Sequence, residues 1–298
     1  MHTKITIFST NDIHGRFLGE NDAIDFSRLA TLKTNTINSL LIDAGDATQG
    51  TPLAIAKMGQ YPIEIMNDVG YDILTVSNHE FDNITKDTEK CELDDIIKKF
   101  NDTYLAANLM KKNGKNYIAE VKNDPDKGSY ELRTVTGKNL LFIGIATPDM
   151  SMDIKRMEDF KIGKLDEFVS QIEKIIFEQR NKKTVDAVII VSHLGIAPNT
   201  TTSDMLAEKV KGIDLIIDGH SYNECTQKAK NGNAYIVQTG CYGKKFSEIT
   251  LDFSDDKKLT VSAVLHDNDY LKNNAQDQNV LKKLTGLKNQ LEKDFGQV

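Results

Sequence analysis

The 298-residue chain contains no tryptophan and only three cysteines, Cys91, Cys225 and Cys241. An odd number of cysteines without a C-x-x-C pair argues against a disulfide framework and a thiolate zinc site, so we expect buried or free thiols. Basic residues are outnumbered, with 37 Lys and Arg against 44 Asp and Glu. The resulting net charge of -7 argues against a stable nucleic-acid partner, because proteins that bind phosphate backbones usually carry excess positive charge.

Long apolar runs and targeting signals are also scarce. The first residues lead straight into a short apolar alternation, without a basic segment, a long apolar core or a small-residue cleavage site, so we expect no secretion signal in this chain. No apolar run approaches the roughly 20 residues that a membrane-spanning helix needs, so we expect no membrane span. The remaining composition is ordinary and predicts one large globular domain, alone or with an appendage.

Short β-branched, apolar runs alternate with amphipathic stretches, which is typical of an α/β domain with sheets between helices. Predicted strands cover residues 4–9, 39–43, 71–77, 104–108, 139–146, 187–192, 213–218 and 234–239, and strand alternation returns over 246–270. Predicted helices cover 52–69, 93–100, 164–179, 202–211 and 280–295. The polar stretch 113–138 is predicted to be a surface hairpin.

Side chains of the kinds that bind metals follow several of the predicted strands. Four of the six histidines stand in these turns, and the full set is Asp12, His14, Asp46, Asn78, His79, His193 and His220. Each residue alone is more often a turn former or a satisfied polar group. Open α/β sheets, however, bind ligands beyond the carboxyl ends of their strands. Recurrence at successive strand ends therefore predicts a single site.

The donors in this set are nitrogen and oxygen, without thiolate, which suits zinc, manganese, iron or cobalt. The number of ligands predicts two divalent ions, and Asp46 could bridge them with its two oxygens. Such a pair favours hydrolysis of a phosphate ester by an activated water. If Asn78 faces the metals, His79 could face the substrate, and Asp82 could accept the other ring proton of His79.

The same segments resemble the calcineurin-like metallophosphoesterases, and within them the catalytic domain of bacterial 5′-nucleotidases and UDP-sugar hydrolases. The resemblance covers most of residues 4–270. Its main motifs are Asn11-Asp12-Ile13-His14-Gly15, Gly45-Asp46, Asn78-His79-Glu80-Phe81-Asp82 and the turns at His193 and His220. It implies a four-layer α/β/β/α sandwich of two mixed sheets flanked by helices.

The resemblance also implies roles for the individual residues. Asp12 and His14 would hold the first metal, with Asp46 as the bridge. The second metal would be held by Asn78, His193 and His220. The implied catalytic pair is His79, which stabilises the phosphoryl transition state, and Asp82, which orients it. The implied substrate contacts are Asn78, His79 and Arg16, although Arg16 could instead form a surface ion pair.

Two features depart from the family pattern. Tyr222 stands where relatives place a further histidine or carboxamide ligand, so we expect water or Asn223 to complete that shell and the first ion to be held more loosely. The family's nucleotidases also continue into a second domain that supplies the nucleoside pocket. We therefore expect residues 1–275 to form the catalytic domain and 276–298 to form a C-terminal helix that links to an absent second nucleotide-binding domain. The alternative is a complete protein that selects its substrate by other means.

Three functions remain open at this point. The first is hydrolysis of nucleotides or nucleotide sugars, and the second is a 2′,3′-cyclic-nucleotide phosphodiesterase with the same metal centre. The third is a metal-binding domain with little turnover, for which Tyr222 and the missing second domain are the support. The location is open as well. Relatives are usually exported or surface-attached, whereas the missing signal permits a cytoplasmic protein.

Overall fold

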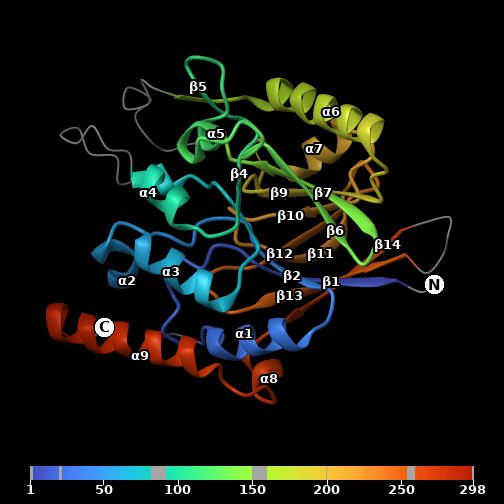
Figure 1. The fold of residues 1–298 in the computed structure, drawn as a ribbon. Coiled ribbons are helices and arrows are strands. Elements are labelled where there is room, and N and C mark those ends of the chain that lie inside the picture. The colour runs from blue at the N-terminus through green and yellow to red at the C-terminus, as the bar shows by residue number, and fades with distance from the viewer. Residues whose placement is uncertain are drawn as a thin grey trace.

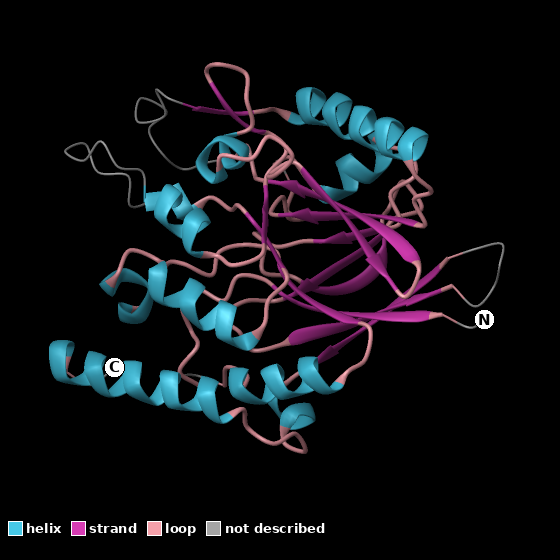
Figure 2. Cartoon of the chain, in the orientation of Figure 1, coloured by secondary structure: helices cyan, strands magenta, loops and turns pink. Residues whose placement is uncertain are grey.

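The computed structural model describes residues 3–19, 22–81, 92–149, 160–198, 200–253 and 259–296. Two six-stranded sheets form the interior, and helices cover their outer faces (Figures 1 and 2). The expected α/β class is confirmed. In the described part of the chain, no helix is both long and apolar enough to cross a bilayer.

The first sheet has the strand order β14-β13-β1-β2-β3-β4. Its strands are β1 (Lys4–Thr10), β2 (Ser39–Asp43), β3 (Ile73–Thr75), β4 (Thr103–Leu105), β13 (Phe246–Asp252) and β14 (Thr260–His266). Strands β1 to β4 are parallel, whereas β13 runs antiparallel to both β1 and β14. The carboxyl ends of the four parallel strands therefore meet at one edge.

The second sheet has the order β11-β12-β10-β9-β7-β6. Its strands are β6 (Tyr130–Val135), β7 (Lys138–Ile145), β9 (Ala187–Ser192), β10 (Leu215–Ile217), β11 (Glu224–Lys228) and β12 (Tyr235–Thr239). The four inner strands are parallel, and β6 and β11 are antiparallel edge strands. A separate antiparallel pair consists of β5 (Leu109–Lys111) and β8 (Phe160–Ile162).

Apolar side chains hold the layers together. Ile7 and Ile42 of the first sheet share a buried cluster with Phe142 and Ile189 of the second. The outer face of the first sheet packs on α1 (Phe26–Asn35), α3 (Gln60–Val69), α4 (Glu92–Lys99) and α9 (Gln278–Phe295). The outer face of the second packs on α6 (Leu165–Lys182) and α7 (Ser203–Lys209). The four-layer α/β/β/α sandwich is therefore confirmed (Figure 1).

Two predicted segments differ from the structure. The predicted helix 52–69 is divided into α2 (Pro52–Ala56) and α3, because Gly59 adopts a left-handed φ of 81° between them. The predicted surface hairpin at 113–138 contains α5 (Tyr117–Lys122) and β6, which joins the second sheet. Asn116 starts α5 by accepting backbone hydrogen bonds from Ile118 and Ala119.

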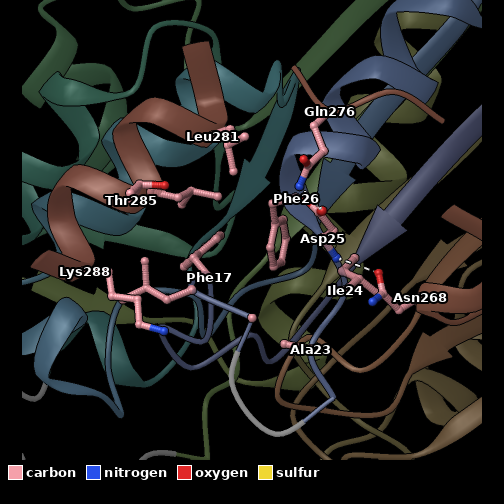
Figure 3. Close-up of a pocket in the computed structure, with 13 residues that line it drawn as sticks. Phe17, Ala23, Ile24, Asp25, Phe26, Asn268, Gln276, Leu281, Thr285 and Lys288 are labelled. Atoms are coloured by element: carbon pink, nitrogen blue, oxygen red, sulfur yellow. Dashed lines mark hydrogen bonds between the residues drawn. The ribbon is translucent and has the colours of Figure 1, made fainter. Parts of the chain in front are cut away.

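The last helix, α9, follows the short α8 (Asn268–Leu271) and belongs to the packed body of the protein. Val280, Leu284 and Leu291 are buried in the same cluster as α1 and α3. A cavity of about 300 Å³ lies between α9 and the residues that lead into α1, where Asp25 donates a backbone hydrogen bond to Asn268 (Figure 3). Its lining contains none of the predicted metal ligands, so it is separate from the candidate site.

Candidate metal centre

The loops after five parallel strands converge where the two sheets meet. The first sheet supplies Asp12 and His14 after β1, Asp46 after β2, and Asn78 and His79 after β3; the second sheet supplies His193 after β9 and His220 after β10. Asp82 lies outside the described residues. The structure thus brings together residues that are widely separated in the sequence.

Asp46 belongs to two groups of possible ligands. One consists of His14, Asp46 and His79, and the other of Asp46, His193 and His220; within each group the ligand atoms lie within 4.8 Å of one another. Oδ2 of Asp46 is 3.9 Å from Nε2 of His14, 3.8 Å from Nε2 of His79 and 3.0 Å from Nε2 of His193. A carboxylate shared by two groups can bridge two ions.

Asp12 lies between the two groups. Its Oδ1 is 3.8 Å from Nε2 of both His14 and His193. Its Oδ2 accepts hydrogen bonds from Asn11 Nδ2 at 2.7 Å and from the backbone nitrogen of His220 at 2.9 Å. One oxygen is therefore fixed by the protein, and the other faces the ligand atoms.

Unpartnered polar atoms test whether the site suits a metal. Among the described residues, Oδ1 of Asp12, Oδ1 of Asn78 and Nε2 of His193 are buried without a hydrogen bond. The contact between His193 Nε2 and Asp46 Oδ2 is short but lacks hydrogen-bond geometry. Because buried polar atoms are normally paired, these unpaired donor atoms suit the binding of a cation. Nitrogen and oxygen donors without thiolate fit the predicted ions.

The electrostatics of the site also favour a cation. Burial raises the pKa of Asp12 to about 7, although His193 opposes the shift. Burial would raise the pKa of Asp46 too, but the charge of His193 holds it well below its usual range. Burial alone would lower the pKa of His193, and the two carboxylates raise it to about 10. Without metal, His193 is therefore the cation that balances the buried acids.

The pKa of His14 shifts in the opposite direction to that of His193. Burial lowers its pKa to about 4, so its ring is neutral at ordinary pH and keeps a lone pair that can bind an ion. Burial likewise lowers the pKa of His220. Neutral imidazoles beside buried carboxylates are the protonation states that metal binding requires.

Several neighbouring groups hold the ligands in place. Nδ1 of His193 lies 2.6 Å from the carbonyl oxygen of Ala44, which directs Nε2 toward Asp46. Asp218 accepts hydrogen bonds from the hydroxyl of Ser192 and from two backbone nitrogens of the turn that follows it. A side chain at Gly219 would place its Cβ 2.8 Å from His193 Nδ1, so only glycine permits this approach.

Ser77 and Glu80 hold the backbone of Asp46 in place through hydrogen bonds. The hydroxyl of Ser77 accepts a hydrogen bond from the backbone nitrogen of Asp46 at 2.9 Å. Glu80 in turn accepts hydrogen bonds from the backbone nitrogen and the hydroxyl of Ser77, and burial raises the pKa of its carboxyl. Sequence reasoning missed the supporting roles of Glu80 and Asp218. The available signal was their position inside the Asn78 and His220 motifs.

Strained backbone is concentrated in these loops. Residues other than glycine rarely adopt left-handed φ angles. Six of the eleven such residues in the described chain lie here: Asp12 (52°), His14 (50°), Asp46 (59°), His220 (76°), Tyr222 (58°) and Tyr242 (62°). Such conformations persist where the surrounding structure enforces them, often at functional sites.

Two tyrosines and an arginine border the site. The hydroxyl of Tyr222 lies 2.8 Å from Nε2 of His14, at the position where the sequence departs from the family. The ring of Tyr242 packs near both His14 and Tyr222. The guanidinium of Arg16 lies 5.3 Å from the centre of the Tyr242 ring. In the described chain, Cys225 and Cys241 are free thiols, whereas Cys91 lies outside the described residues.

No protein-family model matches the chain. Its sequence is 26% identical over 328 residues to a snake venom 5′-nucleotidase from Gloydius brevicauda, covering 97% of this chain and 52% of that protein. It is 27% identical over 286 residues to endonuclease YhcR from Bacillus subtilis (strain 168), covering 86% of this chain and 22% of that protein. The chain thus spans about half, or less, of these relatives.

Among solved structures, the fold matches the calcineurin-like phosphoesterase YfkN from Bacillus subtilis. The match has a TM-score of 0.73 and 22% identity, and covers 98% of this chain and 99% of that one. The predicted resemblance is confirmed. The chain has the calcineurin-like phosphoesterase fold, and its sequence relatives include 5′-nucleotidases aligned over about half their length.

Proposed function

We propose that this chain, with its calcineurin-like fold, is a metal-dependent phosphoester hydrolase of the 5′-nucleotidase type, acting on nucleotides. The observation that carries the proposal is the pair of nitrogen and oxygen donor groups that share Asp46. The names of the relatives favour nucleotides as the substrate class. The chain spans only part of those relatives, and the substrate panel below tests both activity and substrate.

Two divalent ions, chosen from zinc, manganese, iron and cobalt, suit the donors. Asp12 and His14 would hold the first, Asn78, His193 and His220 the second, and Asp46 both. When bound, such a pair supplies a Lewis acid and an activated water for attack on phosphorus. The hydrogen bond between Tyr222 and His14 supports a weaker first site.

His79 is suited to contact the substrate. Its backbone nitrogen donates to Oδ1 of Asp46 at 3.3 Å, which anchors the residue, while 26% of its side chain remains exposed. The ring can therefore donate a hydrogen bond to a phosphoryl oxygen as negative charge develops there. We propose that Asp82 orients the ring. Asn78 and Arg16 remain proposed substrate contacts, and a second nucleotide-binding domain would add contacts to the nucleoside.

A substrate panel tests the proposed function. The protein is stripped with chelator, reloaded with manganese or zinc, and assayed with 5′-AMP, UDP-glucose, 2′,3′-cyclic AMP and an aryl phosphate. We expect metal-dependent release of phosphate from 5′-AMP and the aryl phosphate, and its loss in Asp46→Asn. Preference for 2′,3′-cyclic AMP would indicate the phosphodiesterase. Failure of metal-loaded protein to cleave even the aryl phosphate would refute hydrolysis and favour a metal-binding domain.

A further inference from the structure

We propose that Asn11, which is not among the proposed metal ligands, is a positioning residue for the first metal ion. It holds Asp12 in place by tying the loop after β1 to the end of β12. The inference rests on the proposed function, because it concerns the metal centre that the function requires. The two strands belong to different sheets, so the role of Asn11 depends on how the sheets are joined.

Every hydrogen-bonding position of the Asn11 amide is occupied. Its oxygen accepts from the backbone nitrogen of Thr239 at 2.7 Å and from the hydroxyl of Thr239 at 2.8 Å. Its nitrogen donates to the carbonyl oxygen of Gly240 at 2.8 Å and to Oδ2 of Asp12 at 2.7 Å. An asparagine amide offers two donors and two acceptor positions, so none remains for another partner. Asn11 and Thr239 are both buried, which shields these bonds from water.

This arrangement determines which oxygen of Asp12 can bind an ion. Oδ2 accepts from Asn11 and from the backbone nitrogen of His220, whereas Oδ1 is buried without a hydrogen bond. Two donors on one oxygen oppose rotation of the carboxylate, so Oδ1 stays directed toward Nε2 of His14 and of His193. Without the amide of Asn11, one of these donors is lost. Removing a group that orients a metal ligand typically lowers metal affinity by about 10–100-fold.

Apolar packing between the sheets cannot fix Asp12 in this way. The buried cluster shared by the two sheets sets their separation, but apolar contacts are non-directional. The hydrogen bonds of Asn11 instead require defined distances and angles. The end of β12 carries none of the proposed ligands, and it acts on the metal centre through Asn11.

Asn108 provides a matched control between the same two sheets. It follows β4 of the first sheet, and Ala146 follows β7 of the second. The Asn108 amide accepts from the backbone nitrogen of Ala146 at 2.9 Å and donates to its carbonyl oxygen at 2.8 Å. Asn108 is buried, and its side-chain hydrogen bonds within the described chain reach no proposed metal ligand. Comparison of the two asparagines therefore separates a loss of stability from a loss of metal affinity.

Calorimetric titration of chelator-stripped protein with manganese tests the inference. Asn11→Ala should weaken the weaker binding step about tenfold and leave the tighter step within about twofold, whereas Asn108→Ala should leave both within about twofold. Both variants should unfold at a temperature lower by about 5 °C, because each leaves buried backbone groups unpaired. Saturating manganese should return kcat of Asn11→Ala with 5′-AMP to within about threefold of wild type, because the residue acts through Asp12 and the ion.

Unchanged manganese affinity in Asn11→Ala would overturn the positioning role, and so would equal weakening in both variants. If Asn11→Ala does not fold, Thr239→Val replaces it, since valine removes the hydroxyl that donates to Asn11 and keeps the backbone bond. This variant should weaken the same step about threefold, and an unchanged step would overturn the role.

Failure of the proposed function is distinguishable from failure of this role. It would appear as no hydrolysis of any ester by manganese-loaded wild type, while calorimetry still reports on Asn11. Wild type that binds no manganese would overturn both.

Discussion

The hydroxyl of Tyr222 lies 2.8 Å from Nε2 of His14, the same nitrogen that faces Asp12 and Asp46. Whichever of the two groups donates in this contact, Nε2 is not free to bind an ion while the contact is made. Burial also raises the pKa of the Tyr222 phenol above its usual range, so the neutral hydroxyl persists at ordinary pH. The two metal sites should therefore differ in affinity.

Replacing Tyr222 should make the affinities of the two metal sites more equal. In calorimetric titration with manganese, we expect wild type to bind one ion tightly and a second more weakly. Tyr222→Gln should tighten the weaker step about tenfold, because it frees His14 and offers a carboxamide oxygen. Tyr242→Phe, which keeps the contact between Tyr222 and His14, is the control. An unchanged or weaker second step in Tyr222→Gln would contradict this account.

His79 should affect rate more than metal content. We expect His79→Asn to lower kcat by about 10²–10³, because it removes a donor to the transition state, while both ions remain bound. Asp46→Asn should instead lose metal. The measurements are steady-state kinetics and metal analysis of the same preparations. Loss of one ion in His79→Asn would instead make His79 a ligand, since its ring nitrogen lies within 4.8 Å of the ligand atoms of His14 and Asp46.

Asp218 should contribute strongly to stability although it binds no proposed ion. Its carboxylate accepts four hydrogen bonds, from Ser192, Leu194, Gly195 and Gln238. Asp218→Ala would leave these buried donors unpaired, and we expect a loss of about 3 kcal/mol in urea unfolding. Asp166→Ala, at a side chain that is 88% exposed, should change stability by about 0.5 kcal/mol or less. Equal effects of the two substitutions would disprove the role of Asp218.

Asp43 should make the metal-free protein less stable as pH rises. Burial raises the pKa of this carboxyl from 3.8 to about 8. Between those values the folded state holds a proton that the unfolded state has lost, so stability falls with increasing pH. Asp43→Asn should reduce this slope, leaving the part due to Asp12 and Glu80, and be more stable than wild type at pH 8, by on the order of 2 kcal/mol. Thermal unfolding at pH 5 and pH 8, with chelator, provides the measurement. Parallel pH profiles for the two proteins would refute it.

Much of the fold could be predicted because buried parallel strands are continuous apolar runs, as in β7 and β9. The edge strand β11 escaped prediction because it carries partly exposed polar residues without a clear apolar period, and β6 was predicted only as part of the surface hairpin 113–138. The break between α2 and α3 was also hidden. The apolar spacing continues across it, although Lys57 leaves helical geometry and both Met58 and Gly59 adopt left-handed φ angles.

The residue types at the ends of the strands were readable from the chain alone, because a turn after a buried strand has few reasons to carry histidine and aspartate repeatedly. What those side chains do to one another was decided by the tertiary structure. Tyr222 and His14 are 208 positions apart, and no local pattern could show that they meet. The free oxygen of Asp12 and the exposed rings beside His14 likewise exist only because two sheets place their loops against each other.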